Sequence, residues 1–486
     1  MTNASIGTEQ GNRRWLALGV IVAAQFMVIL DIAIVNVALP SIESDLHFSQ
    51  ESLQWVISAY AIFFGGFLLL GGRLADIFGR RRLFVLGLAL FAASSLLCGL
   101  AGSEGWLIAF RAVQGLGGAL LTPAALSILM TTFAEGRERN IALGIWGAAS
   151  GSGGAAGVLL GGLLTSYLSW SWIFFINVPV GAAVIAFTPW LLRESRSELP
   201  HRHFDVAGAL SVTAGLMLFV YALTRATQHG WSHPSAVALL AGSAALIVAF
   251  VAIELRSAAP LLPMRIFRVR NVAAANATFL VIAAIAFSQF FLLTLYMQQV
   301  LHYSAIETGA GFAAITLTIV VFSNVAQTLV TRFGARWVLA AGLLLSALGL
   351  SLLTRLPVRG HYFWDLFPAL VVSGVGLALS FIPATIAGLT GVSRGDAGIA
   401  SGLINTSRQI GGALGLAAVS TIASSYAGHG SGITSLTHGF HASFYVLTGL
   451  AIVGVLVAAT FIETQPRRVE VEPVSPEITE PLEEAA

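Results

Sequence analysis

The sequence predicts an all-α polytopic membrane protein with fourteen transmembrane helices. Hydrophobic residues make up 56% of the 486 residues and charged residues only 10%, whereas a soluble domain usually carries about 25% charged residues. Fourteen apolar stretches have about 18 residues or more, the length that a helix needs to cross the hydrocarbon core of a bilayer. Several glycines and one arginine-containing stretch of the first half also recur in the second half at a nearly constant spacing, so the helices are expected to form two related halves.

The predicted spans follow one another with short polar connections, and their even number puts both termini on the same side of the membrane. Asn12, Arg13 and Arg14 precede the first span like the charged start of a signal peptide, but this run is too long, contains Asp31 and lacks a cleavage site, so we expect a retained helix. The spans are Trp15–Leu39, Leu53–Leu70, Leu83–Leu100, Trp106–Met130, Ile141–Leu164, Trp172–Leu192, Val206–Leu223, Ala236–Ile253, Val272–Val300, Ile306–Val330, Trp337–Leu353, Phe363–Leu389, Ile399–Ile422 and Phe440–Ile462.

The arginines predict the orientation of these spans. With cytoplasmic termini, only Arg225, Arg355 and Arg359 face outward, while Arg111 and Arg408 lie within spans. The other twenty face inward, which is the asymmetry that the positive-inside rule describes. We therefore expect a multi-pass protein of the cell (cytoplasmic) membrane. The inward arginines are Arg13, Arg14, Arg73, Arg80, Arg81, Arg82, Arg137, Arg139, Arg193, Arg196, Arg202, Arg256, Arg265, Arg268, Arg270, Arg332, Arg336, Arg394, Arg467 and Arg468.

Composition excludes several classes of protein. All 25 basic residues are arginines, so a Walker A loop, whose lysine must reach the nucleotide phosphates, is excluded. Cys98 is the only cysteine, which rules out a disulfide or a paired-cysteine metal site within the chain. The sequence contains no recognisable nucleophile–base pair, so we expect no enzyme activity, no cofactor and no metal.

The two halves of the chain repeat each other. The stretch Leu329–Arg336 matches Leu74–Arg81 at a shift of 255 residues, and Gly115 matches Gly374 at a shift of 259. A third set of glycines matches at a shift of 258: Gly144, Gly153, Gly154 and Gly157 with Gly402, Gly411, Gly412 and Gly415. We therefore predict a cytoplasmic N-terminus (1–14), two six-helix halves (15–192 and 272–462), an inserted helix pair between them (206–253), and a disordered acidic cytoplasmic tail (463–486).

Positive charge is concentrated between the second and third spans, in the run from Gly72 to Leu83. Arg73, Arg80, Arg81 and Arg82 share this run with one carboxylate, Asp76. Such a cluster cannot lie in hydrocarbon, so we expect a loop at the membrane surface. Its spacing, glycine-x-leucine-alanine-aspartate-x-x-glycine-arginine-arginine, resembles the cytoplasmic loop signature of the major facilitator superfamily, with Ile77 where an arginine is frequent.

Several further motifs occur in the same order as in that superfamily. They are Leu30–Pro40 in the first span, Leu53–Tyr60 at the start of the second, Arg111–Gly118 in the fourth and Leu295–Ser304 at the end of the ninth. Over residues 15–462 the chain resembles the fourteen-helix drug:proton antiporters of the superfamily. The resemblance implies a major facilitator fold, with the substrate path between the halves. It also implies that the loop residues Gly72, Asp76, Gly79, Arg80 and Arg81 form a charge lock that stabilises the outward-facing state; the competing interpretation is a loop that only sets the topology.

Asp31 is the only carboxylate deep within a predicted span. A charge there is costly unless it faces protein or water, so Asp31 is a candidate proton-exchange site. Arg111 is a cation within the fourth span that does not deprotonate, and the resemblance implies a part in proton coupling. The alternatives are a carboxylate that only packs helices together and an arginine that extends its side chain to the outer interface.

The fifth span carries glycines at the spacing of the antiporter signature. They are Gly144, Gly153, Gly157, Gly161 and Gly162, with Val158 at the position where the signature has a proline. Small residues at this spacing allow neighbouring helices to approach closely. The missing proline would have bent the helix, so close packing without a gating role is an alternative interpretation.

Polar side chains on otherwise apolar spans are candidates for the substrate cavity: Gln25, Asn36, Tyr60, Gln289 and Tyr296. The predicted function is proton-coupled export of hydrophobic drugs or toxic compounds, cations included, by a monomer. Its partners are the substrate, protons and the lipid bilayer, and no nucleic acid is expected. The alternatives are an exporter dedicated to one metabolite, such as an endogenous antibiotic, a lipid or a siderophore, and a membrane sensor that uses this fold without transport.

Reporter fusions test the predicted topology. A fusion at Arg268 is expected to score cytoplasmic, and fusions at Glu104 and His302 are expected to score outside, because the arginines assign these connections to opposite sides. Phosphatase and fluorescent-protein reporters active on only one side provide the measurement. A cytoplasmic signal at His302 would contradict the fourteen-span topology, since the central pair would have been miscounted.

Overall fold

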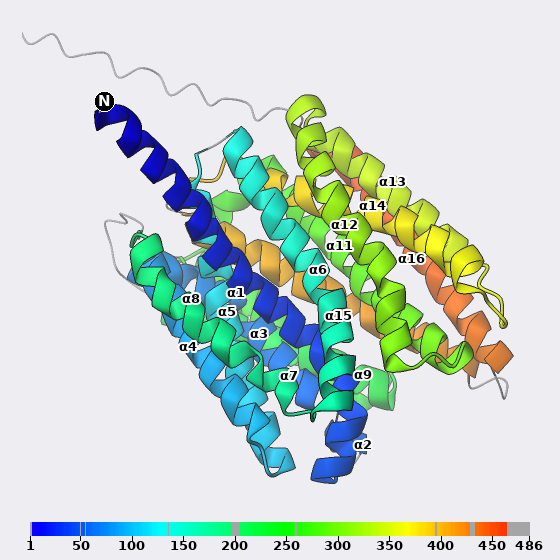
Figure 1. Ribbon diagram of the computed structural model, residues 1–486. Coiled ribbons are helices and arrows are strands. Elements are labelled where there is room, and N and C mark those ends of the chain that lie inside the picture. The colour runs from blue at the N-terminus through cyan, green and yellow to red at the C-terminus, as the bar shows by residue number, and fades with distance from the viewer. Residues whose placement is uncertain are drawn as a thin grey trace, which may run out of the picture.

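The computed structural model is a bundle of long helices (Figure 1). It describes residues 2–48, 50–53, 55–134, 136–196, 205–257, 260–393, 396–427 and 433–463. The residues around His201 and almost all of the acidic tail lie outside these ranges. The helices are α1 (Thr2–Leu46), α2 (Gln50–Leu53), α3 (Trp55–Phe78), α4 (Arg80–Gly99), α5 (Glu104–Thr132), α6 (Arg137–Tyr167), α7 (Trp172–Phe175), α8 (Asn177–Leu191), α9 (Val206–His229), α10 (Pro234–Glu254), η1 (Met264–Arg268), α11 (Arg270–Leu295), η2 (Tyr296–Val300), α12 (Ala305–Phe333), α13 (Ala335–Leu353), η3 (Tyr362–Leu366), α14 (Phe367–Leu389), α15 (Ala397–Ala427) and α16 (Ile433–Phe461).

The prediction of an all-α polytopic protein is confirmed. Among the described residues, thirteen helical stretches are long and apolar enough to cross a membrane, and α7 with α8 forms one of them. The fourteenth long helix is α15, whose first half holds the polar residues Asn405, Arg408 and Gln409. Several helices extend beyond the predicted spans, because helical structure continues past the apolar residues that marked each span in the sequence.

The expectation of a loop from Gly72 to Leu83 is wrong. Helix α3 continues through Phe78, and α4 begins at Arg80, so only Gly79 separates the two helices. Gly79 has a φ of 110°, a left-handed conformation that glycine adopts without the steric cost that other residues incur. The reversal of the chain therefore needs one residue, and Arg73 and Asp76 belong to the last turns of a helix. We refer to this end of the bundle as the arginine-rich end.

The same glycine packing occurs in both halves, as the repeat predicted. In the first half, α6 lies against α1 through Gly153 and Gly157, where an added Cβ would meet Ile29 and Leu30. In the second half, α15 lies against α11 through Gly411 and Gly415, the glycines at the equivalent positions of the repeat. Between the halves, α3 packs on α15, and α6 packs on α12 (Figure 1).

The inserted pair, α9 and α10, contacts both halves through α9. This helix packs against α3 of the first half and α15 of the second. Tyr221 lies beside Trp55 at the start of α3, with 5.5 Å between ring centroids. The Nε1 of Trp231, in the connection from α9 to α10, donates to Oγ1 of Thr421 on α15 over 2.7 Å. Helix α10 packs mainly on α9, so the pair is attached to the bundle along one helix.

Candidate functional site

A buried ion pair joins α1 to α5. Asp31 is completely buried in α1, and Arg111 is 1% exposed near the start of α5. The Nη1 of Arg111 donates to Oδ2 of Asp31 over 2.7 Å. A buried charge without a partner is strongly destabilising, so each of these two residues needs the other. The structure thus brings the two predicted proton-coupling residues into direct contact.

Two side-chain amides complete the hydrogen bonding of the carboxylate. Gln114 on α5 donates through Nε2 to Oδ1 of Asp31 over 2.8 Å, and Asn177 at the start of α8 donates through Nδ2 to the same oxygen over 2.9 Å. The Oε1 of Gln114 accepts from Nη1 of Arg111 over 2.7 Å. Three donors therefore surround the carboxylate.

Sequence reasoning missed both amides. Gln114 lies three residues after Arg111 and therefore one helical turn away, which is a signal that could have identified it. Asn177 is 146 residues from Asp31 along the chain, and no local pattern marks it. It also donates to Oγ of Ser95 on α4 over 3.0 Å, and Ser95 donates to the carbonyl of Phe174 over 2.9 Å. The network thus joins α1, α4, α5 and α8 inside one half.

The guanidinium of Arg111 is held on several sides. Its Nε donates to the carbonyl of Val56 on α3 over 3.0 Å. Its carbon Cζ lies 4.3 Å from the ring centroid of Tyr60 and 5.7 Å from that of Phe174, distances at which an aromatic face attracts a cation. The side chain is therefore fixed inside the half and does not extend to the end of the bundle.

The glycines of α6 divide into two sets. Gly153, Gly157 and Gly161 face α1 at Ile29, Ala33 and Ile34, on either side of Asp31 along that helix. Gly144 and Gly162 face α12 of the other half at Gln327 and Ile306. Val158 also lies on the α12 side, beside Gly309. The signature helix thus packs against the acid-bearing helix on one face and against the other half on the opposite face.

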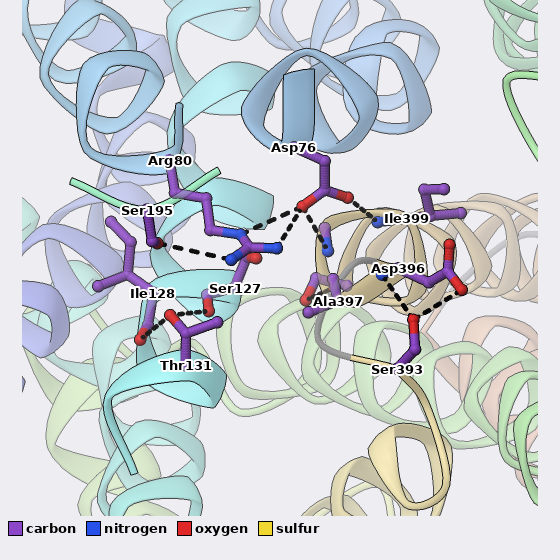
Figure 2. Close-up of polar contacts among 12 residues, drawn as sticks. Asp76, Arg80, Ser127, Ile128, Thr131, Ser195, Ser393, Asp396, Ala397 and Ile399 are labelled. Atoms are coloured by element: carbon purple, nitrogen blue, oxygen red, sulfur yellow. Dashed lines mark hydrogen bonds and ion pairs between the residues drawn. The ribbon is translucent and has the colours of Figure 1, made fainter. Parts of the chain in front are cut away.

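At the arginine-rich end, Asp76 connects the two halves (Figure 2). Its Oδ1 accepts from Nη2 of Arg80 over 2.8 Å and from the backbone N–H of Gly398 over 3.3 Å. Its Oδ2 accepts from the N–H of Ile399 over 3.2 Å. Both N–H groups lie in the first turn of α15, where the helix dipole favours a negative charge. Asp76 is completely buried, so this contact is not screened by water.

The other residues of the expected lock have different partners. Arg81 lies 3.9 Å from the carboxylate of Glu194 and donates to the carbonyl of Leu192 over 3.3 Å, so its described partners differ from Asp76. Gly72 lies against Gly398, where a Cβ would collide with the backbone of α15. The contact between α3 and α15 at this end therefore depends on Asp76 and on the close approach at Gly72.

The predicted cavity residues occupy different environments. Both amide atoms of Gln289, the Oε1 of Gln25 and the hydroxyl of Tyr60 are buried without a hydrogen-bond partner among the described residues. Asn36 is exposed and donates to the carbonyl of Ile32 in its own helix. Tyr296 is buried, and its hydroxyl donates to the carbonyl of Pro357.

A separate cavity of about 220 Å³ lies at the arginine-rich end. Its lining comes from both halves, and it includes none of the predicted cavity residues. The lining residues are Met130, Gly136, Arg139, Asn140, Leu143, Ile386, Leu389 and Thr390.

The chain is similar in sequence to one family of known proteins along most of its length. The model of the Major Facilitator Superfamily matches residues 21–416 and, in an overlapping match, residues 274–485. The puromycin resistance protein pur8 of Streptomyces alboniger is 39% identical over 470 residues, covering 93% of this chain and 92% of that protein. The cephamycin export protein CmcT of Amycolatopsis lactamdurans is 42% identical over 425 residues, covering 86% and 87%.

A solved structure shares the fold. The human organic anion transporter MFSD10 (TETRAN) superposes with a TM-score of 0.66, covering 92% of this chain and 99% of that chain at 16% identity. This likeness, together with the repeated packing of the halves, confirms the predicted arrangement of two six-helix halves.

Replacing Gly157 with alanine tests the contact between α6 and α1. The new Cβ would lie 2.8 Å from the Leu30 carbonyl, so α6 is expected to move away from α1 and disturb the Asp31 network at a cost of about 1–3 kcal/mol. We expect a clear loss of drug efflux and a lower unfolding temperature of the purified protein. Gly154→Ala is the matched control, because no atom lies within 4 Å of its added Cβ. Equal activity of the two variants would contradict the proposed importance of this contact.

Asp76→Asn tests the contact at the arginine-rich end. The substitution keeps the shape but removes the charge at the start of α15, an interaction of about 1 kcal/mol or more. We expect transport to fall about fivefold or more while ligand affinity changes little. Glu138→Gln is the control, because that acid pairs with Arg14 inside the first half. Full transport by Asp76→Asn at normal expression would leave the run around Asp76 with a topological role only.

Proposed function

Because the chain belongs to the Major Facilitator Superfamily, we propose that it is a proton-coupled secondary transporter that exports hydrophobic drugs or toxic compounds, cations included. The names of its relatives support export: one is a puromycin resistance protein, one a cephamycin export protein and one, from Streptomyces glaucescens, a tetracenomycin C resistance and export protein. The observation that carries the proton-coupling part of the proposal is the buried pair of Asp31 and Arg111.

We further propose that the protein resides in the cytoplasmic membrane with both termini, and therefore the arginine-rich end, in the cytoplasm. The excess of arginine at the predicted inner connections supports this orientation. In that orientation, two contacts hold the cytoplasmic ends of the two halves together. The first turn of α15 donates hydrogen bonds to Asp76 of α3, and Gly72 of α3 lies against Gly398. These contacts favour the conformation that is closed to the cytoplasm, and they must separate before substrate can enter from that side.

Exchange of substrate for protons requires a group that is charged in one state and neutral in the other. Asp31 can take both forms, whereas Arg111 stays charged and provides a fixed counter-charge. When Asp31 is ionised, the pair is neutral overall, and when Asp31 binds a proton, the site gains one positive charge. A cationic substrate is repelled by the protonated site, so proton binding favours its release to the outside.

Substrate recognition is proposed to involve the buried polar atoms that lack partners. The amide of Gln289 offers one acceptor and two donors, and the Oε1 of Gln25 offers a further acceptor. The hydroxyl of Tyr60, on the ring that Arg111 covers, also has no hydrogen-bond partner within the part of the chain that the structure describes. A ligand that hydrogen-bonds here satisfies groups that are otherwise costly to bury. Asn36 and Tyr296 already have partners, so they are weaker candidates for this role.

A second candidate is an exporter dedicated to one metabolite, because all three of these relatives are named for a single compound: puromycin, cephamycin or tetracenomycin C. A susceptibility panel in an efflux-deficient host, with and without a proton uncoupler, separates the two functions. Resistance to many unrelated compounds supports a multidrug exporter, whereas resistance to one chemical family supports the dedicated one.

Asp31→Asn tests the proton site. The variant keeps the size of the side chain and can still form hydrogen bonds, but it cannot ionise. Energised efflux and substrate-induced proton movement in proteoliposomes are therefore expected to fail even where substrate still binds. Asp31→Glu is the matched control, and it should retain part of the activity because the longer acid still titrates. Normal movement of protons and drug by the asparagine variant would place the proton site elsewhere.

A further inference from the structure

We propose that Asn177 is a positioning residue that stabilises both charge states of Asp31, with its amide turning over when the acid binds a proton. This inference rests on the proposed function of Asp31 as the proton site. Every side-chain contact to the carboxylate in the structure comes from a donor, namely Arg111, Gln114 and Asn177.

Such a set of donors suits only the ionised acid. Once Asp31 is protonated at Oδ1, its hydroxyl is itself a donor, and it points at the N–H groups of Gln114 and Asn177. A buried donor without an acceptor costs about 1–3 kcal/mol. One of the three partners must therefore provide an acceptor, or proton binding would be opposed by a lost hydrogen bond.

Two of the partners cannot provide it. Arg111 has donors only. Gln114 has an amide oxygen, but this oxygen accepts from Nη1 of Arg111 over 2.7 Å. Turning the Gln114 amide would let its oxygen accept from the acid, but it would place its NH₂ group against the N–H of the guanidinium. Two donors would then face each other at Arg111 instead of at Asp31. Gln114 is thus fixed in its present orientation by the arginine.

Asn177 is under no such constraint. Among the described residues, its Nδ2 donates to Asp31 and to the hydroxyl of Ser95, and a hydroxyl can either accept or donate. When the amide turns, its Oδ1 accepts from the protonated acid. Ser95 can then turn its hydrogen from the carbonyl of Phe174 to the same Oδ1, while that carbonyl keeps the N–H of Ile176. In this arrangement the hydroxyl of the acid, the hydroxyl of Ser95 and the carbonyl of Phe174 each have a partner.

The position of Asn177 suits this role. It is the first residue of α8, 1% exposed, and Ser95 and Asp31 are completely buried. The other ionisable or charged groups nearest to Asp31 in the described residues are Arg111 on α5, Tyr60 on α3 and Cys98 on α4. None of them supplies an acceptor to the carboxyl hydroxyl in the structure, so the amide of Asn177 is the group that responds to its proton.

Infrared difference spectroscopy on the full-length protein in lipid tests the proposal. Spectra at low and high pH contain the C=O stretching band of protonated Asp31, which Asp31→Asn identifies by removing it. In Asn177→Leu, which has neither donor nor acceptor, the hydroxyl of the protonated acid loses its acceptor while Arg111 still donates to Oδ2, so the band is expected to move to a higher frequency. Transport driven by a pH gradient should fall about tenfold, the equivalent of one hydrogen bond. Drug affinity at one fixed pH should change far less.

Two further variants complete the experiment. Asn177→Gln keeps an amide and is expected to retain a hydrogen-bonded band and part of the transport. Thr188→Val is the matched control on α8, because its buried hydroxyl donates only to the carbonyl of Val184 in its own helix; it should leave the band and transport unchanged. If the leucine variant does not fold, Asn177→Val serves as the variant without an amide.

The outcomes separate this inference from the function on which it rests. A band that Asp31→Asn removes but Asn177→Leu does not move would overturn the role of Asn177 and leave Asp31 as the proton site. Spectra in which Asp31→Asn removes no band would overturn both proposals. A band that moves in Asn177→Leu and returns toward its original position in Asn177→Gln supports the turning amide.

Discussion

The burial of one acid and one cation in the same half imposes the constraint on which the rest of the site depends. Asp31 and Arg111 are each tolerated only because the other lies 2.7 Å away, and the remaining lone pairs and N–H groups must also be satisfied. This requirement accounts for Gln114 and Asn177 on the carboxylate, for the carbonyl of Val56 on the guanidinium, and for the glycines of α6 that let α1 lie close. The neighbouring helices are arranged around an ion pair that the membrane would otherwise exclude.

Features that depend on residues close together in the sequence could be predicted, whereas contacts between residues far apart in the sequence could not. The spans, the repeat and the individual importance of Asp31 and Arg111 follow from apolar length, spacing and the cost of charge in lipid. Their contact does not, because residues 80 positions apart carry no local sign of meeting. Asn177 illustrates the same limit, since it lies in an apolar helix where an asparagine has no evident partner.

For the run from Gly72 to Leu83, the predicted loop is wrong, because the chain is helical on both sides of Gly79. Its charges correctly marked the end of an apolar stretch. A cluster of charges indicates where the chain leaves the hydrocarbon of the membrane, but it does not indicate where the helix ends. The chain remains helical to Phe78, and the carboxylate of Asp76 in its last turns is bound by Arg80 and by the first N–H groups of α15. The backbone reverses only at Gly79, where φ is positive. The partner of Asp76 in the other half is the start of α15, 322 residues further along the chain at Gly398. The sequence around Asp76 does not reveal this contact.

Helix α3 connects the two charged sites. Tyr60 lies under the guanidinium of Arg111 near one end of α3, and Asp76 bridges to α15 near the other. The two residues are sixteen positions apart, which corresponds to about 24 Å along a straight helix. A helix that packs through backbone contacts, as α3 does at Gly71 on Ala119 and at Gly72 on Gly398, moves as a unit, so a tilt that relaxes one contact alters the other. The ion pair has no contact with the second half in the described residues, and α3 therefore offers a direct physical route by which a change of charge at Asp31 can reach the contact that holds the halves together.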